Sequence, residues 1–307
     1  MPVIAITGAT GFLGSHLVEA VLESGQRARG VVRSPEKATP HARAQGSAEF
    51  VKGDLGDRDS LRHAFTGADV VVANAALSTR RAAAWRDFEA ANLGGVENTL
   101  RAAADAGVTR VVMISTIAVY RARLGRPNGV DTPLLTNGSI PFTTSMLTTN
   151  WRYSLSKARG EALAWRLAGE LGIDLTVLRP GPIYGPRDTK LTAMYAGWMQ
   201  RRITFAPTVK MPHVHAGDVA RGVIGAIGNP ASAGRAYNVT GPVASIHEVL
   251  THWKRLTGKG PVLIPIPLPL SMSFDDSEST RDLSFSARTI EDGVRDVLAH
   301  PIETRIT

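Results

Sequence analysis

The sequence predicts an α/β protein built on a doubly wound parallel sheet with a smaller C-terminal lobe. Short apolar runs without charges alternate with segments of helical periodicity up to residue 180. The first run, Val3–Thr7, leads into glycines at positions 8, 11 and 14 and then into a helical pattern. Strands buried on both faces are continuously apolar, and their alternation with helices is typical of a parallel sheet.

The glycines are expected to form a tight turn between the first strand and the first helix. A side chain at Gly8 or Gly11 would keep the backbone from approaching a pyrophosphate, and Gly14 allows the helix to pack closely on the strand. The helix N-terminus would then face the phosphates. The pattern indicates a dinucleotide site, although glycine turns also join strands to helices without any ligand.

The stretch Thr7-Gly-Ala-Thr-Gly-Phe-Leu-Gly14 resembles the extended short-chain dehydrogenase/reductase family, which includes the NAD(P)-dependent epimerases and dehydratases. The resemblance implies a Rossmann fold and a nicotinamide dinucleotide cofactor. Within the turn it implies cofactor contacts for Gly8, Thr10, Gly11, Phe12, Leu13 and Gly14.

A second strand, Ala28–Val32, ends at Arg33 with no acidic residue. An acidic side chain at this place binds the ribose 2′-hydroxyl of NAD, whereas an arginine suits the 2′-phosphate of NADP. We therefore expect NADP, with NAD possible. The alternative is an arginine that is simply exposed at a strand end.

Two further strands are expected over residues 49–55 and 69–76. The resemblance places Asp54 and Leu55 beside the adenine; alternatively, Asp54 caps a helix expected near residues 59–65. Small residues at the end of the fourth strand, Ala75 among them, leave room for a ligand in the crevice outside the strand ends.

A helix is expected from about residue 82 to 106, followed by a strand over Arg110–Thr116. Within that helix, Asn92 matches the family pattern and is a weaker functional candidate. Thr116 precedes Tyr120 by four residues, which by resemblance makes it the catalytic hydroxyl residue. Its neighbour Ser115 is the alternative, as is a hydroxyl bonded only to the turn backbone.

Tyr153 and Lys157 lie four residues apart at the start of a helix expected over residues 156–171. This spacing places both side chains on one helix face. A nearby ammonium lowers the pKa of a tyrosine, so Tyr153 is the expected acid/base and Lys157 its partner. A surface tyrosine and a solvated lysine are the alternative, because chance matches to this pattern are frequent.

A sixth strand, Leu175–Pro180, leads into a turn over residues 181–186 that resembles the family's border of the nicotinamide. The resemblance implies cofactor contacts for Pro180 and Ile183. Val214–His215 is expected as a strand that re-enters the main domain. His213 and His215 are expected to be structural, and no metal site is predicted, because no carboxylate accompanies them in sequence.

The expected dinucleotide-binding domain comprises residues 1–180 plus about 213–240. The expected substrate-binding lobe comprises about 181–212 plus 241–307, with a helix over 246–257. Residues 121–150 are rich in Gly, Pro, Asn and Thr and are expected to form a long loop.

Composition excludes several classes of protein. The 307 residues contain no cysteine, so disulfides, thiolate nucleophiles and cysteine-ligated metals are excluded. No apolar run reaches the length of a membrane span, and no basic region precedes the first apolar residues, so we expect a cytoplasmic protein without a membrane partner. The net charge of +8 favours a phosphorylated ligand over nucleic acid, because the glycine turn already accounts for an anion site.

The leading hypothesis is an NADP-dependent oxidoreductase that transfers a hydride between the nicotinamide and a small, non-nucleotide carbonyl/alcohol substrate. Pro182 and Met211 stand where nucleotide-sugar enzymes of the family commonly have Asn and Arg that touch a diphosphate. The alternatives are an NAD-dependent nucleotide-sugar epimerase or dehydratase and a non-catalytic dinucleotide sensor. The resemblance also implies a homodimer formed through helices near 82–106 and 153–171.

Overall fold

The computed structural model describes residues 1–37, 48–78, 84–136, 141–143 and 150–300. Within these residues the centre is a seven-stranded sheet in which all neighbouring strands are parallel, in the order β12-β7-β5-β4-β1-β2-β3. The strands are β1 Val3–Thr7, β2 Arg27–Val32, β3 Glu49–Lys52, β4 Val70–Ala73, β5 Arg110–Ile114, β7 Asp174–Pro180 and β12 Arg235–Val239. The predicted Rossmann fold is therefore confirmed.

The strand order reverses beside β1, with β2 and β3 on one side and β4, β5, β7 and β12 on the other. All five residues of β1 are buried, as the apolar run predicts. In open α/β sheets ligands bind outside the carboxyl ends of the strands at such a reversal. The crevice between the ends of β1 and β4 is therefore the expected binding place.

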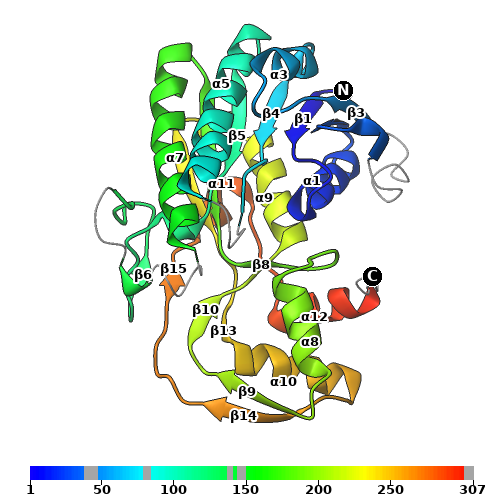
Figure 1. Ribbon diagram of the computed structural model, residues 1–307, viewed down its shortest axis with the longest axis vertical. Coiled ribbons are helices and arrows are strands. Elements are labelled where there is room, and N and C mark those ends of the chain that lie inside the picture. The colour runs from blue at the N-terminus through cyan, green and yellow to red at the C-terminus, as the bar shows by residue number, and fades with distance from the viewer. Residues whose placement is uncertain (38–47, 79–83, 137–140, 144–149, 301–307) are drawn as a thin grey trace.

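Helices cover both faces of this central sheet (Figure 1). The buried side chains of three helices pack with the sheet into one core, and those of three others form a second core on the opposite face. The first layer consists of α1 Phe12–Glu23, α9 Ala216–Gly228 and α11 Ser277–Leu283; the second consists of α3 Arg58–Phe65, α5 Gly95–Asp105 and α7 Trp151–Leu171.

A smaller lobe lies at the other end of the molecule in Figure 1. Its core includes Tyr195, Leu250 and Trp253. It contains α8 Leu191–Met199, α10 Ile246–Thr257, α12 Ile290–Ala299, β9 Ile203–Pro207, β10 Lys210–Pro212, β13 Val243–Ser245 and β14 Val262–Ile266. The helix predicted over residues 246–257 is confirmed, and Ser245 and Glu248 form a capping box at its start. The division into two domains stays a prediction.

The short elements complete the chain: η1 Pro35–Lys37, α4 Trp85–Glu89, η2 Ala90–Gly94, η3 Ile117–Val119, β6 Pro127–Asn128, β8 Ile183–Tyr184, β11 Val214–His215, η4 Pro230–Ser232 and β15 Ser273–Phe274. β11 pairs with β8 in a separate two-stranded sheet. The chain therefore returns to the central sheet through α9 and β12, and the short strand at Val214–His215 does not join it.

Two predicted helices differ from the structure in their bounds. In place of one helix over 82–106, α4 and α5 are separated by the π turn η2, and residues 82 and 83 lie outside the described part. Asn92 in this turn accepts a hydrogen bond from Leu77 N at 2.8 Å and donates to Ser156 Oγ at 2.9 Å. The helix predicted from residue 156 begins at Trp151, because Asn150 caps it through Arg152 N.

The predicted long loop over residues 121–150 contains β6, which pairs with β15. Residues 137–140 and 144–149 of this loop lie outside the described part.

Candidate active site

The glycine turn brings the backbone of residues 8–14 into close contact with itself. Gly8 has a φ of +68°, a conformation that favours glycine. A Cβ at Gly14 would lie 2.0 Å from the Gly8 carbonyl oxygen, so only glycine fits there. Gly11 caps α1 without a side-chain hydrogen bond, and the first turn holds no acidic residue. The first N–H groups of α1 are thus available to phosphate oxygens.

A pocket of about 1360 Å³ opens at the carboxyl ends of the central strands and extends to α8 of the smaller lobe. Its size and its glycine turn fit a nicotinamide dinucleotide together with a substrate. The structure brings all the sequence-predicted site residues to its wall: Gly8, Thr10, Gly11, Phe12, Leu13, Gly14, Arg33, Asp54, Leu55, Ala75, Thr116, Tyr153, Lys157, Pro180 and Ile183.

Arg33 lies at the end of β2 and is exposed. Within the described part of the chain, no carboxylate forms an ion pair with it. Asp54 does not cap α3, as one alternative proposed, because Asp57 accepts the hydrogen bond from Ser60 N. The Asp54 carboxylate accepts from Gly56 N at 2.8 Å and so holds the turn after β3.

Thr116 and Tyr153 both line the pocket, and a hydrogen bond joins their side chains. Thr116 Oγ1 also accepts from Ala118 N at 3.2 Å, so it both caps the turn and faces the pocket. Lys157 is buried, and its Nζ donates to the Ile114 carbonyl oxygen at 2.7 Å. The ends of β5 and α7 therefore hold all three side chains in one place.

The pKa of Tyr153 differs from the expectation that Lys157 lowers it. Burial raises the pKa of Tyr153 to about 12, and the hydrogen bond from Thr116 opposes that rise only in part. Burial also lowers the pKa of Lys157 to about 8, against the attraction of Glu161. Desolvation outweighs the hydrogen bond with Thr116 at Tyr153 and the attraction of Glu161 at Lys157. Tyr153 is consequently a protonated phenol at neutral pH.

A buried polar network behind Lys157 was missed by sequence reasoning. Ser115 Oγ donates to Glu161 Oε2 at 2.6 Å, so this hydroxyl is held by Glu161. Glu161 is fully buried and paired with Arg179, whose Nη1 donates to Tyr120 at 2.6 Å. The signal was present, because Glu161 follows Lys157 at the same four-residue spacing by which Lys157 follows Tyr153.

The far end of the pocket is formed by the smaller lobe and is largely apolar. Its lining there includes Leu191, Met194, Tyr195, Trp198, Met211, His213 and Ile246. Tyr195 and His213 share a hydrogen bond of 2.9 Å, and His213 Nδ1 lies 2.9 Å from the Met211 carbonyl oxygen. The polar groups of this pair thus satisfy each other.

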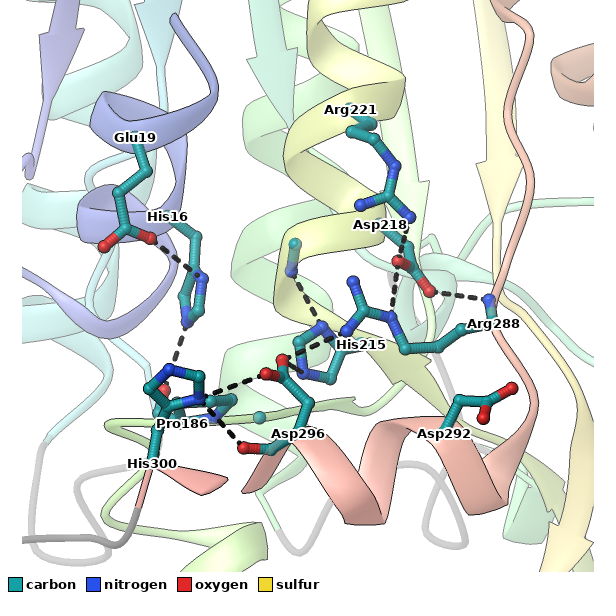
Figure 2. Close-up of polar contacts among 12 residues, drawn as sticks. His16, Glu19, Pro186, His215, Asp218, Arg221, Arg288, Asp292, Asp296 and His300 are labelled. Carbon is teal, nitrogen blue, oxygen red and sulfur yellow. Dashed lines mark hydrogen bonds and ion pairs between the residues drawn. The ribbon is translucent and has the colours of Figure 1, made fainter. Parts of the chain in front are cut away.

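His16 and His215 belong to a second buried cluster that lies outside the pocket lining (Figure 2). His16 Nε2 bonds the Pro186 carbonyl oxygen at 3.1 Å, and His215 Nε2 lies 3.0 Å from Asp296 Oδ2. Burial lowers the pKa of His16 to about 4 and that of His215 to about 2. The described residues contain no group of three or more side chains suited to a metal.

None of the described helices combines the length and apolar character needed to cross a bilayer.

Comparison with known proteins extends these observations. The family model of the NAD dependent epimerase/dehydratase family matches residues 4–240. Cinnamoyl-CoA reductase 1 of Petunia hybrida is 38% identical over 191 residues, which is 60% of this chain and 55% of that relative. The corresponding reductase of Arabidopsis thaliana is 33% identical over 60% of this chain and 53% of its own. The chain therefore spans about half the length of these curated relatives.

Tetraketide alpha-pyrone reductase 1 of Arabidopsis thaliana is 29% identical over 98% of this chain and 95% of that relative. Among solved structures, UDP-Glucuronic acid 4-epimerase from Bacillus cereus has a TM-score of 0.80 at 21% identity, covering 97% of this chain and 98% of the other. At that identity the likeness shows the fold alone. The glycine turn, the Thr116–Tyr153–Lys157 arrangement and the match over residues 4–240 agree, and the chain belongs to the NAD-dependent epimerase/dehydratase family of extended short-chain dehydrogenases/reductases.

Proposed function

We propose that this protein is an NADP-dependent reductase or dehydrogenase of a small, non-nucleotide carbonyl/alcohol substrate. The observation that carries the proposal is the placement of Thr116, Tyr153 and Lys157 on one pocket that also holds the glycine turn and Arg33. A non-catalytic sensor has no need to keep a proton donor beside a cationic side chain at this position.

Tyr153 acts as the general acid in the direction of reduction. A bound nicotinamide dinucleotide supplies the hydride, which goes to the carbonyl carbon. The raised pKa keeps Tyr153 protonated, and it gives its phenolic proton to the carbonyl oxygen, so an alcohol forms. With substrate bound, the Thr116 hydroxyl would donate its one hydrogen bond to the same oxygen in place of Tyr153. Lys157 provides the positive charge that favours the phenolate left on Tyr153 until solvent returns the proton.

Arg33 supports the preference for NADP, because its guanidinium is exposed at the end of β2 and suits a phosphate. The first test is to denature the purified protein, identify any released nucleotide, and titrate NADPH and NADH. Arg33→Gln should lower the affinity for NADPH by about ten- to a hundredfold and leave the affinity for NADH nearly unchanged. Arg62→Gln is the control, because Arg62 is a partly exposed arginine on α3 that lies outside the pocket lining and pairs with Asp59. Tightly retained NAD⁺ would overturn the preference for NADP.

The apolar far end of the pocket supports a substrate without a diphosphate. Pro182 and Met211 line it and offer no side-chain hydrogen-bond donor. Lys190 also lines the pocket, and its ammonium group donates to Ser78 Oγ at 2.5 Å. The reductase names of the curated relatives agree with a carbonyl substrate. Purified protein with NADPH should reduce members of a panel of aromatic and aliphatic ketones and aldehydes. Turnover of nucleotide sugars alone would move the epimerase or dehydratase function to first place.

We also propose a homodimer through the helices near residues 82–106 and 153–171, which rests on the family resemblance alone, and a cytoplasmic location, which rests on the sequence pattern. Analytical ultracentrifugation at micromolar concentration tests the dimer, and a monomer alone would remove it.

A further inference from the structure

Strands β9 and β14 form a two-stranded parallel ribbon at the end of the smaller lobe farthest from the central sheet (Figure 1). Their register aligns Ile203 with Val262 and Phe205 with Ile264. Residues that alternate along a strand point to the same face, so these side chains form two adjacent rows. We call this surface, which Ile266 extends, the ribbon face.

The ribbon face is apolar and open to solvent. Phe205 is 63% exposed, Val262 60% and Ile203 53%. The opposite side of β9 is buried, because Thr204 is 2% exposed and Ala206 belongs to the core of the lobe, and Leu263 on β14 is partly buried against the same core. An exposed group of large apolar side chains in regular rows is unusual for a soluble surface and indicates a contact with a partner.

The segments that flank the ribbon face are rich in basic residues, of which Lys210 and Arg255 are paired with Glu248 and Glu291. Residues 199–210 and 251–271 contain six lysines and arginines and no aspartate or glutamate. Arg201, Arg202 and Lys259 lie at the ends where the strands begin and are exposed. Among the described residues, no carboxylate forms an ion pair with any of these three side chains.

We propose that the ribbon face docks on the surface of an anionic lipid bilayer. Apolar side chains beside basic ones suit the interface, where the apolar rows enter the acyl boundary and the cations contact acidic headgroups. A second copy of the chain would bring the same positive charges together without compensation. Nucleic acid is disfavoured because the rows are mainly aliphatic and offer one aromatic ring for stacking.

Docking of this kind is a surface contact, independent of the proposed catalytic function. Trp198 of α8 lines the pocket, and the chain passes from α8 directly to Arg201 and β9. The ribbon therefore follows directly in sequence on the helix that lines the pocket, although no residue of β9 or β14 lines the pocket.

The test is sedimentation of the full chain with vesicles of phosphatidylcholine alone and with a roughly three-to-one mixture of phosphatidylcholine and phosphatidylserine. We expect binding to the anionic vesicles only, weakened by salt. Phe205→Ser should reduce the affinity by about tenfold or more, because an apolar side chain no longer enters the interface. The double variant R201Q/R202Q should reduce the affinity by roughly twenty-five-fold, since each lysine or arginine near such a surface contributes about fivefold.

Val243→Ser is the matched control, because Val243 is a 37% exposed apolar residue on another strand of the same lobe. It should leave vesicle binding unchanged. Thermal unfolding and NADPH titration of every variant show whether weaker vesicle binding comes from the changed surface residue or from unfolding of the protein.

Three outcomes would overturn the proposal. One is absence of binding to the anionic vesicles. Another is binding that Phe205→Ser leaves unchanged, because the apolar rows would then play no part. The third is a dimer in ultracentrifugation that Phe205→Ser dissociates, which would assign the ribbon face to a second copy of the chain.

Discussion

Two buried groups of titratable side chains differ in what surrounds them. Tyr153 and Lys157 face the pocket with Thr116. His16 and His215 are buried outside its lining, where His215 lies 3.0 Å from Asp296, which is 30% exposed (Figure 2), and His16 lies 2.9 Å from Arg187. Burial shifts the pKa of His215 from 6.5 to about 2, a larger change than that of Tyr153. A strongly shifted pKa therefore does not mark the active site unless the group also reaches a cavity.

The largest expected effect is on catalysis by the first group. Tyr153→Phe removes the proton donor, so kcat should fall by about a hundred- to ten-thousandfold. Cofactor affinity, measured by fluorescence titration, should stay close to that of the wild type. Tyr237→Phe is the matched control, since Tyr237 is buried outside the pocket lining and bonds Asp282. A Tyr153→Phe enzyme with full kcat would remove the proposed role.

Removal of a buried carboxylate should affect the two regions unequally. Glu161→Gln leaves Arg179 without its charge partner, and unfolding in urea should show a loss of about 3–5 kcal/mol. Asp218, which holds Arg221 and Arg288, is also buried, but its arginines are 56% and 23% exposed. Asp218→Asn should therefore lower the free energy of unfolding by less than Glu161→Gln does, because solvent screens the unpaired arginines. Equal losses would show that the two networks do not differ in this way.

The smallest effect per residue is the pH dependence of stability from two buried histidines, His16 of the second group and His213 of the pocket lining. Burial lowers the pKa of His16 and of His213 to about 4, so the unfolded chain binds more protons below its own pKa near 6.5. Stability should be constant above that pH and fall as the pH decreases towards 4. Between pH 7 and pH 5 each histidine should lower the free energy of unfolding by about 2 kcal/mol.

Urea unfolding at the two pH values measures this loss. His16→Gln should make the dependence shallower. An unchanged slope would show that His16 does not supply it.

The sequence predicts the central sheet well because strands buried on both faces are continuous apolar runs. It places the glycine turn, Arg33 and the Tyr153–Lys157 pair on one pocket because each stands at a strand end or on one helix face. Prediction from the sequence fails where side chains form hydrogen bonds between elements that are far apart in the chain. Asn92 interrupts a helix through bonds to Leu77 and Ser156, which no local pattern reveals.

The raised pKa of Tyr153 was equally beyond a local pattern. The four-residue spacing shows that a lysine is near, but desolvation depends on how the pocket wall closes around the phenol. The Glu161–Arg179 pair likewise joins α7 to β7 across the fold. Spacing therefore predicts which groups meet, and three-dimensional burial decides their protonation.

The buried polar network behind Lys157 depends on residues from the C-terminal part of the chain. Tyr120 donates to Asn238 at 2.8 Å, and Asn238 in turn donates to the Asp275 carbonyl oxygen at 3.1 Å. A fragment cut at residue 240 would keep every residue of the proposed chemistry but lose this last support. The hydrogen bonds that link Tyr120 to the C-terminal segment therefore join residues 1–240 to the rest of the chain.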